Sequence, residues 1–557
     1  MSETIQRRDY ATIFLVSFAF LLGLYVRLAP VHRVDFPLND GGMFYSLTGD
    51  LLEADLRQPD YSSYNLAPGG GVGVEIPFTY PPLAFYLVAG LSRLTGAGLL
   101  DVLRIAPALM AALAVPAFYL LAKPILNSQA QAALATFAFA MLPRSFEWLI
   151  MGGGVTRAPG YVFAILALAA GVRLYQRPRP SLAALTGALA GLTALSHPEM
   201  NLFVVYSLSL IFLASGSRRA GLAASGLALA VAAAVAAPWW VHALRVHGPE
   251  PLLAAFGSGH RVWFTLGTVL MFDLSFEAFL SLIGVAALLG LLACIVERKR
   301  LLPVWILVIA ILSPRSAGTL AAIPLAMLAA IGLEGVIIPG VRLLSAAGSS
   351  ASEVLGEAGS WALRLVQPLP VRGLLIVFGL YALLGAYLYP FVGSTAVSSL
   401  PPDERAAMAW IAANTPETSR FLVVSGLQNV WQDQSSEWLP ALSGRVSLGT
   451  VQGYEWLPGR FYQQWQHYAG LQACGMQTID CLEDWANTNQ LDFSHIYLPK
   501  RLWWDSATSN TPLRVSLEQA AGYQPVYENE AVVIYVRDER VGAAGRPGGQ
   551  SRLGAAR

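Results

Sequence analysis

The sequence predicts a polytopic α-helical membrane domain of about eleven transmembrane helices, followed by a C-terminal mixed α/β domain in water. Hydrophobic residues make up 55% of the chain and charged residues only 13%, and the mean hydropathy is +0.52. These values exclude an ordinary soluble protein. After residue 394 the composition changes, because Asp, Glu, Gln and Asn become frequent. We therefore expect a membrane domain over residues 1–393 and a separate extracytoplasmic domain over residues 394–540.

Apolar runs predict the individual spans, since a helix needs about 20 mostly apolar residues to cross a bilayer. The expected spans lie near residues 11–30, 103–122, 129–147, 158–175, 181–196, 200–215, 220–241, 276–296, 301–313, 317–338 and 373–393. The run Leu83–Leu91 is too short to cross and follows Pro81-Pro82, a pair that resists helix formation. We expect it to form a half-embedded helix within a first outer loop, residues 31–102.

The distribution of Lys and Arg predicts the orientation. With eleven crossings, twelve Lys and Arg between residues 123 and 372 lie on the inner side and five on the outer side. Treating Leu83–Leu91 as a full crossing inverts this ratio and violates the positive-inside rule. The chain is therefore expected to be a multi-pass cell-membrane protein with a cytoplasmic N-terminus and an extracytoplasmic C-terminal domain.

Overall charge and short motifs disfavour two further classes. The 36 Lys and Arg nearly balance the 35 Asp and Glu, so no basic field exists to attract nucleic acid, and no nucleic-acid partner is predicted. The sequence has no Walker-type loop, dinucleotide fingerprint, HExxH or CxxC motif, which disfavours a P-loop pump.

The polar C-terminal region is expected to form one compact domain. A helix is predicted over Pro402–Asn414 and strands over Phe421–Val424, Ile496–Leu498 and Val532–Val536. Cys474 and Cys481 form one disulfide if this region is exported, or stay reduced if it is not. The tail at 541–557, rich in Gly, Ala and Arg, is predicted to be disordered.

The strongest local motif is Asn39-Asp40-Gly41-Gly42, directly after the first span. An Asp at the mouth of a span suits a general base or a metal ligand, and two following glycines let a substrate approach the backbone closely. The same residues also fit an Asp N-cap on a helix over Gly41–Leu52, with the glycines only making the turn. Spacing alone leaves both interpretations open.

Other ionisable and aromatic residues stand on the predicted outer side. Arg157, after a glycine-rich turn, either binds a phosphate bidentately or reaches toward lipid headgroups. Arg315 splits a long apolar stretch, and an ionisable group so placed is a functional candidate. His197 and Glu199 interrupt apolar sequence and either line the same cavity or sit in an interfacial loop, but they do not define a metal site. Tyr80 precedes the two prolines that start the half-embedded helix.

The order of these features resembles the GT-C superfamily of membrane glycosyltransferases over roughly residues 10–400. This superfamily includes protein mannosyltransferases, aminoarabinose transferases and oligosaccharyltransferase catalytic subunits. Asn39-Asp40-Gly41 is similar to its first acidic motif, and Tyr80-Pro81-Pro82 to the end of its first outer loop. The resemblance implies inverting transfer of a hexosyl or pentosyl group from a polyprenyl-phosphate-linked donor in the membrane lipid. The acceptor would be a protein, lipid or glycan on the outer face.

The resemblance also suggests roles for individual residues. Asp40 takes the role of catalytic base or metal-positioning carboxylate. A polyprenyl phosphate is already a competent leaving group, so the enzyme further needs cations for the departing phosphate, which Arg157 or Arg315 would supply. Further substrate contacts are expected from Asn39, Tyr80, His197 and Glu199.

Two departures from the family pattern affect these expectations. Ala409–Glu417 resembles the helix that opens the oligosaccharyltransferase soluble domain, and Trp431-Gln432-Asp433 stands where a Trp-Trp-Asp motif is expected. The second Trp and a following Tyr-Gly are missing, which argues against recognition of a glycosylation sequon. Val155-Thr156-Arg157 replaces the second acidic motif, so we expect weak or no metal dependence, with a divalent metal at Asp40 still possible.

Two alternative functions remain open from the sequence. A transporter or flippase for a lipid-linked glycan would also use many spans, but it predicts pseudo-symmetric halves that the sequence does not display. A non-catalytic envelope-glycan assembly protein would bind glycan by stacking on C-terminal tryptophans, or those tryptophans pack in the domain core. They are Trp438, Trp456, Trp465, Trp485, Trp503 and Trp504.

Overall fold

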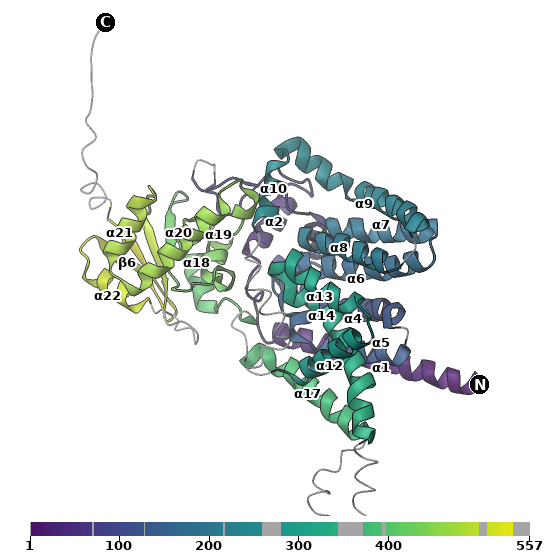
Figure 1. The fold of residues 1–557 in the computed structure, drawn as a ribbon. Helices are drawn as coiled ribbons and strands as arrows, with labels where there is room; N and C mark the ends of the chain where they lie inside the picture. The colour runs from purple at the N-terminus through teal and green to yellow at the C-terminus, as the bar shows by residue number, and fades with distance from the viewer. Residues whose placement is uncertain are drawn as a thin grey trace, which may run out of the picture. The chain divides into compact units, whose positions relative to one another are not determined.

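The structure is a computed structural model that describes residues 2–68, 72–126, 128–215, 218–258, 280–343, 371–392, 397–500 and 510–538 (Figure 1). The chain divides into two compact units. The helical unit consists of Met1–Leu38, Thr79–Val246 and Gly259–Ser398, and the mixed unit of Asn39–Phe78, His247–Ser258 and Ser399–Arg557. The mixed unit therefore takes in two segments that the sequence assigned to the membrane domain. The predicted disordered tail, Trp503 and Trp504 lie outside the described residues.

Apolar helices build the helical unit. They are α1 (Ser2–His32), α3 (Leu83–Thr95), α4 (Leu99–Leu126), α5 (Gln129–Met141), α6 (Gly154–Gln176), α7 (Pro180–Ala194), α8 (Pro198–Ser215), α9 (Arg218–His247), α12 (Leu282–Val296), α13 (Leu301–Leu312), α14 (Ala317–Gly332) and α17 (Val371–Val392). Short turns of 3₁₀ helix lie at η1 (Pro143–Ser145), η2 (Glu147–Leu149) and η3 (Pro314–Ser316), and η4 (Leu333–Ile337) is a π-helical turn.

Among the described residues, seven helices are long and apolar enough to cross a membrane. They are Tyr10–His32, Leu99–Leu126, Gly154–Gln176, Pro198–Ser215, Arg219–His247, Pro314–Leu343 and Val371–Tyr389. The predicted polytopic helical membrane domain is thus confirmed, but the count of eleven spans is not. Helices α5, α7, α12 and α13 have only 13, 15, 15 and 12 residues. The helix predicted from Leu83 is present, and its 13 residues are too few to cross a bilayer.

The predicted helix over 129–147 is wrong beyond Met141, where α5 ends. Leu142 is extended, with φ −79° and ψ 114°, because a residue before proline avoids the helical conformation. The buried guanidinium of Arg27, on α1, holds the chain at this point. It donates hydrogen bonds to the carbonyl of Ala140 (2.9 Å) and to the Ser145 hydroxyl (3.2 Å), and it lies 4.5 Å from the Phe146 ring centre. The Arg27 side chain thus supplies a hydrogen-bond donor to a backbone carbonyl at the end of α5, inside the membrane domain.

Close glycine contacts fix α14 against α12. A Cβ on Gly290 would lie 1.9 Å from the carbonyl oxygen of Leu328, and a Cβ on Gly332 would lie 1.9 Å from that of Ala286. Small residues let transmembrane helices approach in this way, since apolar burial alone does not drive their association in lipid. Helix α14, which follows Arg315, is therefore firmly seated in the helical unit.

The mixed unit is an α/β structure. Its helices are α2 (Gly42–Glu53), α10 (Glu250–Gly257), α18 (Pro402–Asn414), α19 (Gln434–Ser443), α20 (Phe461–Ala473), α21 (Ile479–Thr488) and α22 (Thr511–Gln519). Its strands are β1 (Tyr61–Ser62), β2 (Ile76–Pro77), β3 (Arg420–Val423), β4 (Val446–Ser447), β5 (His495–Pro499), β6 (Tyr523–Glu528) and β7 (Val532–Arg537), and its 3₁₀ turns are η6 (Val430–Gln432), η7 (Tyr454–Trp456) and η8 (Cys474–Met476).

Within the described residues, β3 to β7 form a five-stranded sheet in the order β4-β3-β5-β7-β6. Strand β3 pairs in parallel with β4 and β5, whereas β7 is antiparallel to both β5 and β6. The predicted helix at Pro402–Asn414 and all three predicted strands are found, so the predicted mixed α/β domain is confirmed. Trp438, Trp456 and Trp485 are 0%, 4% and 8% exposed, which assigns these three tryptophans to packing rather than to a glycan platform.

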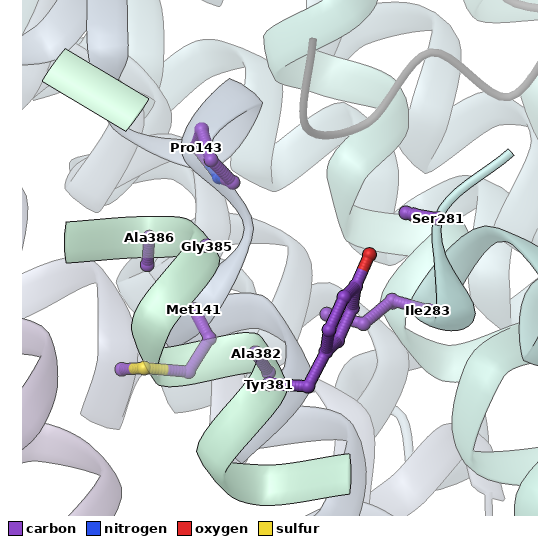
Figure 2. Close-up of a pocket in the computed structure, with 8 residues that line it drawn as sticks. All are labelled: Met141, Pro143, Ser281, Ile283, Tyr381, Ala382, Gly385 and Ala386. Atoms are coloured by element: carbon purple, nitrogen blue, oxygen red, sulfur yellow. The ribbon is translucent and has the colours of Figure 1, made fainter. Parts of the chain in front are cut away.

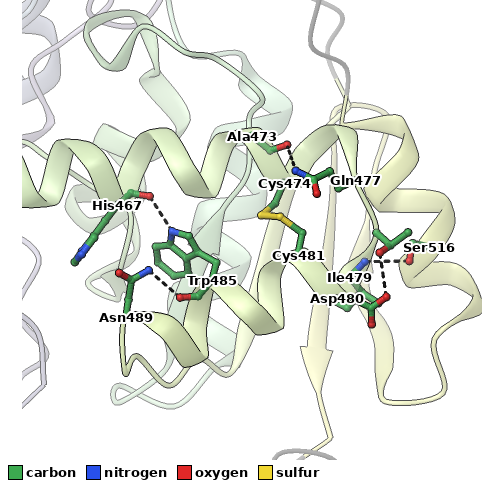
Figure 3. The surroundings of a disulfide bond; sticks show 11 residues. His467, Ala473, Cys474, Gln477, Ile479, Asp480, Cys481, Trp485, Asn489 and Ser516 are labelled. Carbon is green, nitrogen blue, oxygen red and sulfur yellow. Dashed lines mark hydrogen bonds between the residues drawn. A yellow bond between two sulfur atoms is a disulfide. The ribbon is translucent and has the colours of Figure 1, made fainter.

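Cys474 and Cys481 form a disulfide that joins η8 to α21, with the two Cα atoms 5.5 Å apart (Figure 3). Polar contacts surround it. The Trp485 indole donates to the carbonyl of His467 at 2.9 Å, and the backbone N–H of Ile479 donates to the Ser516 hydroxyl at 3.1 Å. The pairing that the sequence left open is therefore present, as expected for an oxidising compartment.

Candidate functional site

The predicted site residues fall into two groups, one in each unit. Asn39 and Asp40 belong to the mixed unit, on a turn that we call the acidic turn (Asn39–Gly42). The other five belong to the helical unit and form a group that we call the cationic cluster. Its members are Tyr80, Arg157, His197, Glu199 and Arg315.

The acidic turn leads directly into α2. The N-cap residue of this helix is Gly41, with φ 135°, and a glycine has no side chain with which to make the capping hydrogen bond. The alternative in which Asp40 is the N-cap is therefore wrong. Asp40 is half-buried, one residue before the cap.

Asn39 is used inside the protein. It is 2% exposed, its side-chain amide donates to the carbonyl of Trp431 at 2.9 Å, and its own carbonyl accepts from the Trp438 indole at 2.9 Å. These bonds fix the start of the acidic turn. They indicate that Asn39 shapes the turn, whereas the sequence predicts a substrate contact there.

In the helical unit, Tyr80 stands between α6 and the segment that follows α7. Its hydroxyl lies 3.2 Å from that of Thr156, in the first turn of α6. Its ring meets the His197 ring edge-on, with the ring centres 6.2 Å apart. Nearby, Arg157 lies 4.9 Å from the centre of the Trp148 ring, a cation–π contact that orients the guanidinium.

His197 lies within the electrostatic reach of both arginines of the cluster. Burial, reinforced by the positive charges of Arg157 and Arg315, lowers the pKa of His197 to about 3. The imidazole is therefore neutral at physiological pH. Its Nδ1 atom is buried and has no hydrogen-bond partner among the described residues. Helix α6 passes close by, because a Cβ on Gly160 would lie 3.1 Å from the His197 Cβ.

Glu199 connects the start of α8 to η3, the turn that carries Arg315. Its Oε2 accepts a hydrogen bond from the Ser316 hydroxyl at 2.7 Å. Beside it, Tyr206 donates to the Ser313 hydroxyl at 3.0 Å. The structure thus brings together residues from four separate segments of the sequence. Two guanidinium groups beside a neutral imidazole suit an anion such as a phosphate.

The sequence does not single out Glu147 as a candidate, although its carboxylate is buried in the helical unit. It is 3% exposed on η2, accepts a hydrogen bond from the Tyr389 hydroxyl, and lies 3.7 Å from the Arg144 guanidinium. Its signal in the sequence is weak, since it is one acid in an otherwise apolar turn. Through these two contacts Glu147 links η2 to Tyr389 on α17 and to Arg144 on η1.

Asp433, at the position of the expected Trp-Trp-Asp motif, is also committed to internal contacts. It is 2% exposed and accepts hydrogen bonds from the hydroxyls of Ser425 (2.7 Å) and Tyr468 (3.0 Å) and from the backbone N–H of Ser436 (3.1 Å). Burial raises the pKa of Asp433, although these three bonds oppose the shift. Its carboxylate caps α19 and lies in the interior of the mixed unit.

The described residues contain no group of three or more His, Cys, Asp and Glu side chains that could hold a metal ion. A pocket between the end of α5 and helices α12 and α17 shares no residue with either group (Figure 2). Small and apolar side chains such as Met141, Ile283 and Ala382 dominate its lining, with hydroxyls from Ser281 and Tyr381.

Comparison with known proteins adds independent evidence. Residues 79–242 match the family model described as dolichyl-phosphate-mannose-protein mannosyltransferase. A search of curated protein sequences gives no match.

Solved structures resemble the chain over most of its length. The archaeal oligosaccharyltransferase AglB from Archaeoglobus fulgidus, in complex with an inhibitory peptide and a dolichol-phosphate, has 14% identity and a TM-score of 0.54, covering 96% of this chain and 75% of its own. ArnT from Cupriavidus metallidurans in the apo state has 14% identity and a TM-score of 0.52, covering 95% and 98%. The arabinofuranosyltransferase AftD from Mycobacteria has 16% identity and a TM-score of 0.53, but the match covers only 40% of AftD and 94% of this chain. At such identities the likeness establishes a shared fold.

Proposed function

We propose, from the premise that this chain has the fold of the GT-C superfamily of membrane glycosyltransferases, that it transfers a sugar from a polyprenyl-phosphate-linked donor to an acceptor on the outer face of the membrane. The observation that carries this proposal is the cationic cluster. Arg157 and Arg315 both lie near the neutral His197, whose buried Nδ1 has no partner among the described residues. AglB was solved in complex with a dolichol-phosphate and ArnT bound to undecaprenyl phosphate. These two structures of the same fold support a phosphate-linked lipid as the ligand.

The chemistry assigns a different task to each group. The bond between the sugar C1 and the phosphate oxygen breaks, and its electron pair leaves with the polyprenyl phosphate. Arg157 and Arg315 stabilise the charge that develops on this phosphate. His197, being neutral, serves as a hydrogen-bonding group and does not add a third charge. Tyr80 and Glu199 hold the segments that carry these residues.

Asp40 is proposed as the general base. It accepts the proton of the acceptor hydroxyl while the hydroxyl oxygen attacks C1 on the face opposite to the leaving phosphate, which inverts the anomeric centre. The transferred group is a hexosyl or pentosyl unit. No step is assigned to a metal, and a divalent ion at Asp40 remains a prediction.

The acceptor is proposed to be a lipid, a glycan or a protein that lacks a glycosylation sequon. The support comes from Asp433, whose carboxylate already accepts three internal hydrogen bonds. A buried carboxylate whose three hydrogen-bond donors all come from the chain itself is unsuited to bind an acceptor peptide.

Transfer of label from a radiolabelled mixture of polyprenyl-phosphate sugars, with purified protein in lipid vesicles, tests the proposal. Wild-type protein is expected to label an acceptor, whereas Asp40→Ala and Asp40→Asn lose at least about 100-fold in rate. Asp60→Asn, which neutralises an exposed acid of the same outer segment, serves as the control and should retain activity. Full activity in correctly inserted Asp40→Asn protein would refute the base role. Absence of transfer with any donor would favour the transport or assembly functions.

A further inference from the structure

The acidic turn is held by one side chain that follows it by 396 residues. Glu437, in the first turn of α19, accepts hydrogen bonds from the backbone N–H groups of Gly41 (2.8 Å) and Gly42 (3.0 Å) at a single oxygen, Oε1. Its other oxygen accepts from the Gln452 amide at 3.2 Å, and the side chain is only 5% exposed. Helix α2 lacks a capping side chain of its own, so Glu437 supplies both the acceptor and the negative charge that a helix N-terminus favours.

Neighbouring residues strengthen this attachment. The Trp438 indole donates to the carbonyl of Asn39, and the Tyr64 hydroxyl donates to the carbonyl of Glu437 at 2.8 Å. Residues on both sides of Asp40 are thus bonded to α19. The direction in which the Asp40 side chain leaves the turn depends on these bonds.

The same contact explains the two glycines. Gly41 has φ 135°, a backbone conformation that residues other than glycine rarely adopt. A Cβ on Gly42 would lie 2.7 Å from the Glu437 carbonyl oxygen and 3.3 Å from its Cγ. At Gly42 the space that a side chain would fill is therefore occupied by Glu437.

We propose that Glu437 is a positioning residue for sugar transfer, which acts by fixing the backbone of Gly41 and Gly42 and so aiming Asp40. This inference rests on the proposed function of Asp40. Charge-assisted hydrogen bonds to a carboxylate are among the strongest in proteins, and two of them converge here. A displacement of a catalytic group by about 1 Å can lower a rate by about 100-fold.

Amide hydrogen exchange combined with transfer kinetics tests the inference on the full chain in lipid. Glu437→Ala should exchange the amides of the 41–45 segment at least about tenfold faster and lower kcat by about 10- to 100-fold, with the donor KM changed by less than about twofold. Glu437→Gln retains an acceptor oxygen and should recover most of both losses. Glu404→Ala is the matched control, because Glu404 is another buried glutamate that bonds α19, through the Ser435 hydroxyl. It should leave exchange at 41–45 and kcat close to wild type.

The outcomes separate this inference from the proposed function. Unchanged exchange in Glu437→Ala, or faster exchange with unchanged kcat, would overturn the positioning role. A loss of kcat of the same size in Glu404→Ala would also overturn it, since general destabilisation of the mixed unit would then explain the effect. If the wild-type protein transferred no sugar, the proposed function and the aiming of Asp40 would fail together, whereas exchange would still decide whether Glu437 holds the turn.

Discussion

The Tyr80 hydroxyl lies 3.2 Å from the Thr156 hydroxyl, and Thr156 donates its own hydrogen to the carbonyl of Gly153 at 3.1 Å. Tyr80 is therefore the donor in this pair. The bond joins the segment before α3 to the first turn of α6, where Arg157 follows directly. The position of Arg157, which we propose binds the phosphate, thus depends on the hydrogen bond between the Tyr80 and Thr156 hydroxyls.

Removing this bond should weaken the helical unit modestly. Tyr80→Phe keeps the ring and its contact with His197 but loses the hydroxyl, so we expect a loss of about 0.5–1.5 kcal/mol in unfolding free energy. Unfolding of purified protein in detergent measures it. In a double-mutant cycle with Thr156→Val, the two effects should be less than additive. Strictly additive losses would mean that the two hydroxyls do not interact.

The two arginines of the cationic cluster should act on the donor. Arg157→Ala and Arg315→Ala each remove a charged hydrogen-bond donor, so the donor KM should rise or kcat fall by about 10- to 100-fold. Arg157→Lys should recover only part, since an ammonium lacks the planar fork that binds phosphate bidentately. Arg177→Ala, at an exposed arginine beyond the far end of α6, is the control. Normal donor kinetics in both cluster variants would exclude a phosphate site there.

His197 should not titrate in the physiological range. Because its folded pKa is about 3, below the ordinary value of 6.5, the unfolded chain binds the proton first as the pH falls. Stability contributed by the neutral imidazole is complete above about pH 6.5 and declines toward about pH 3. Thermal unfolding of wild type and His197→Asn at pH 7.5 and pH 5 checks this, and the wild type should lose more stability than the variant on acidification. Equal losses would contradict a neutral His197.

The disulfide should stabilise the mixed unit specifically. A bridge between residues separated by seven positions contributes about 2 kcal/mol through the unfolded state. Cys474→Ser with Cys481→Ser should lower the unfolding temperature of the mixed unit, while Cys294→Ala, at the free buried cysteine of α12, changes only the helical unit. Alkylation of denatured, non-reduced protein should label one cysteine per chain. Labelling of three would show that the bridge is absent in the protein tested.

Periodicity and composition were sufficient where the physics is local. The apolar run at 11–30 predicts a span because the bilayer sets its length, and the strand at Val532–Val536 follows from a continuous run of β-branched and aromatic residues. Arg157, His197 and Arg315 could be selected singly, because each charge or imidazole is costly in apolar sequence. Their grouping required the structure, since nothing local links three turns that far apart.

Other features escaped for physical reasons that a single sequence hides. Glu437 looks like an ordinary first-turn acid of a helix, and only the folded mixed unit brings it to Gly41. The sequence leaves open whether Asp40 caps α2, because the acceptor that the helix uses comes from a distant segment and not from the preceding residue. The sequence predicts a helix to residue 147, whereas α5 ends at Met141, because the backbone is extended at Leu142.

The discontinuous mixed unit constrains the order in which the chain can mature. The Asn65 side chain both donates to and accepts from the backbone of Ser447, which is 382 residues later in the sequence. Gly41 likewise bonds Glu437, which is 396 residues later. Ribosomes add about 5–20 residues per second, so tens of seconds separate the synthesis of the two partners. During that interval the segment that carries Asp40 is without the partners that shape it. If Asp40 is the general base that we propose, a nascent or truncated chain ending before α19 would be inserted in the membrane yet catalytically silent.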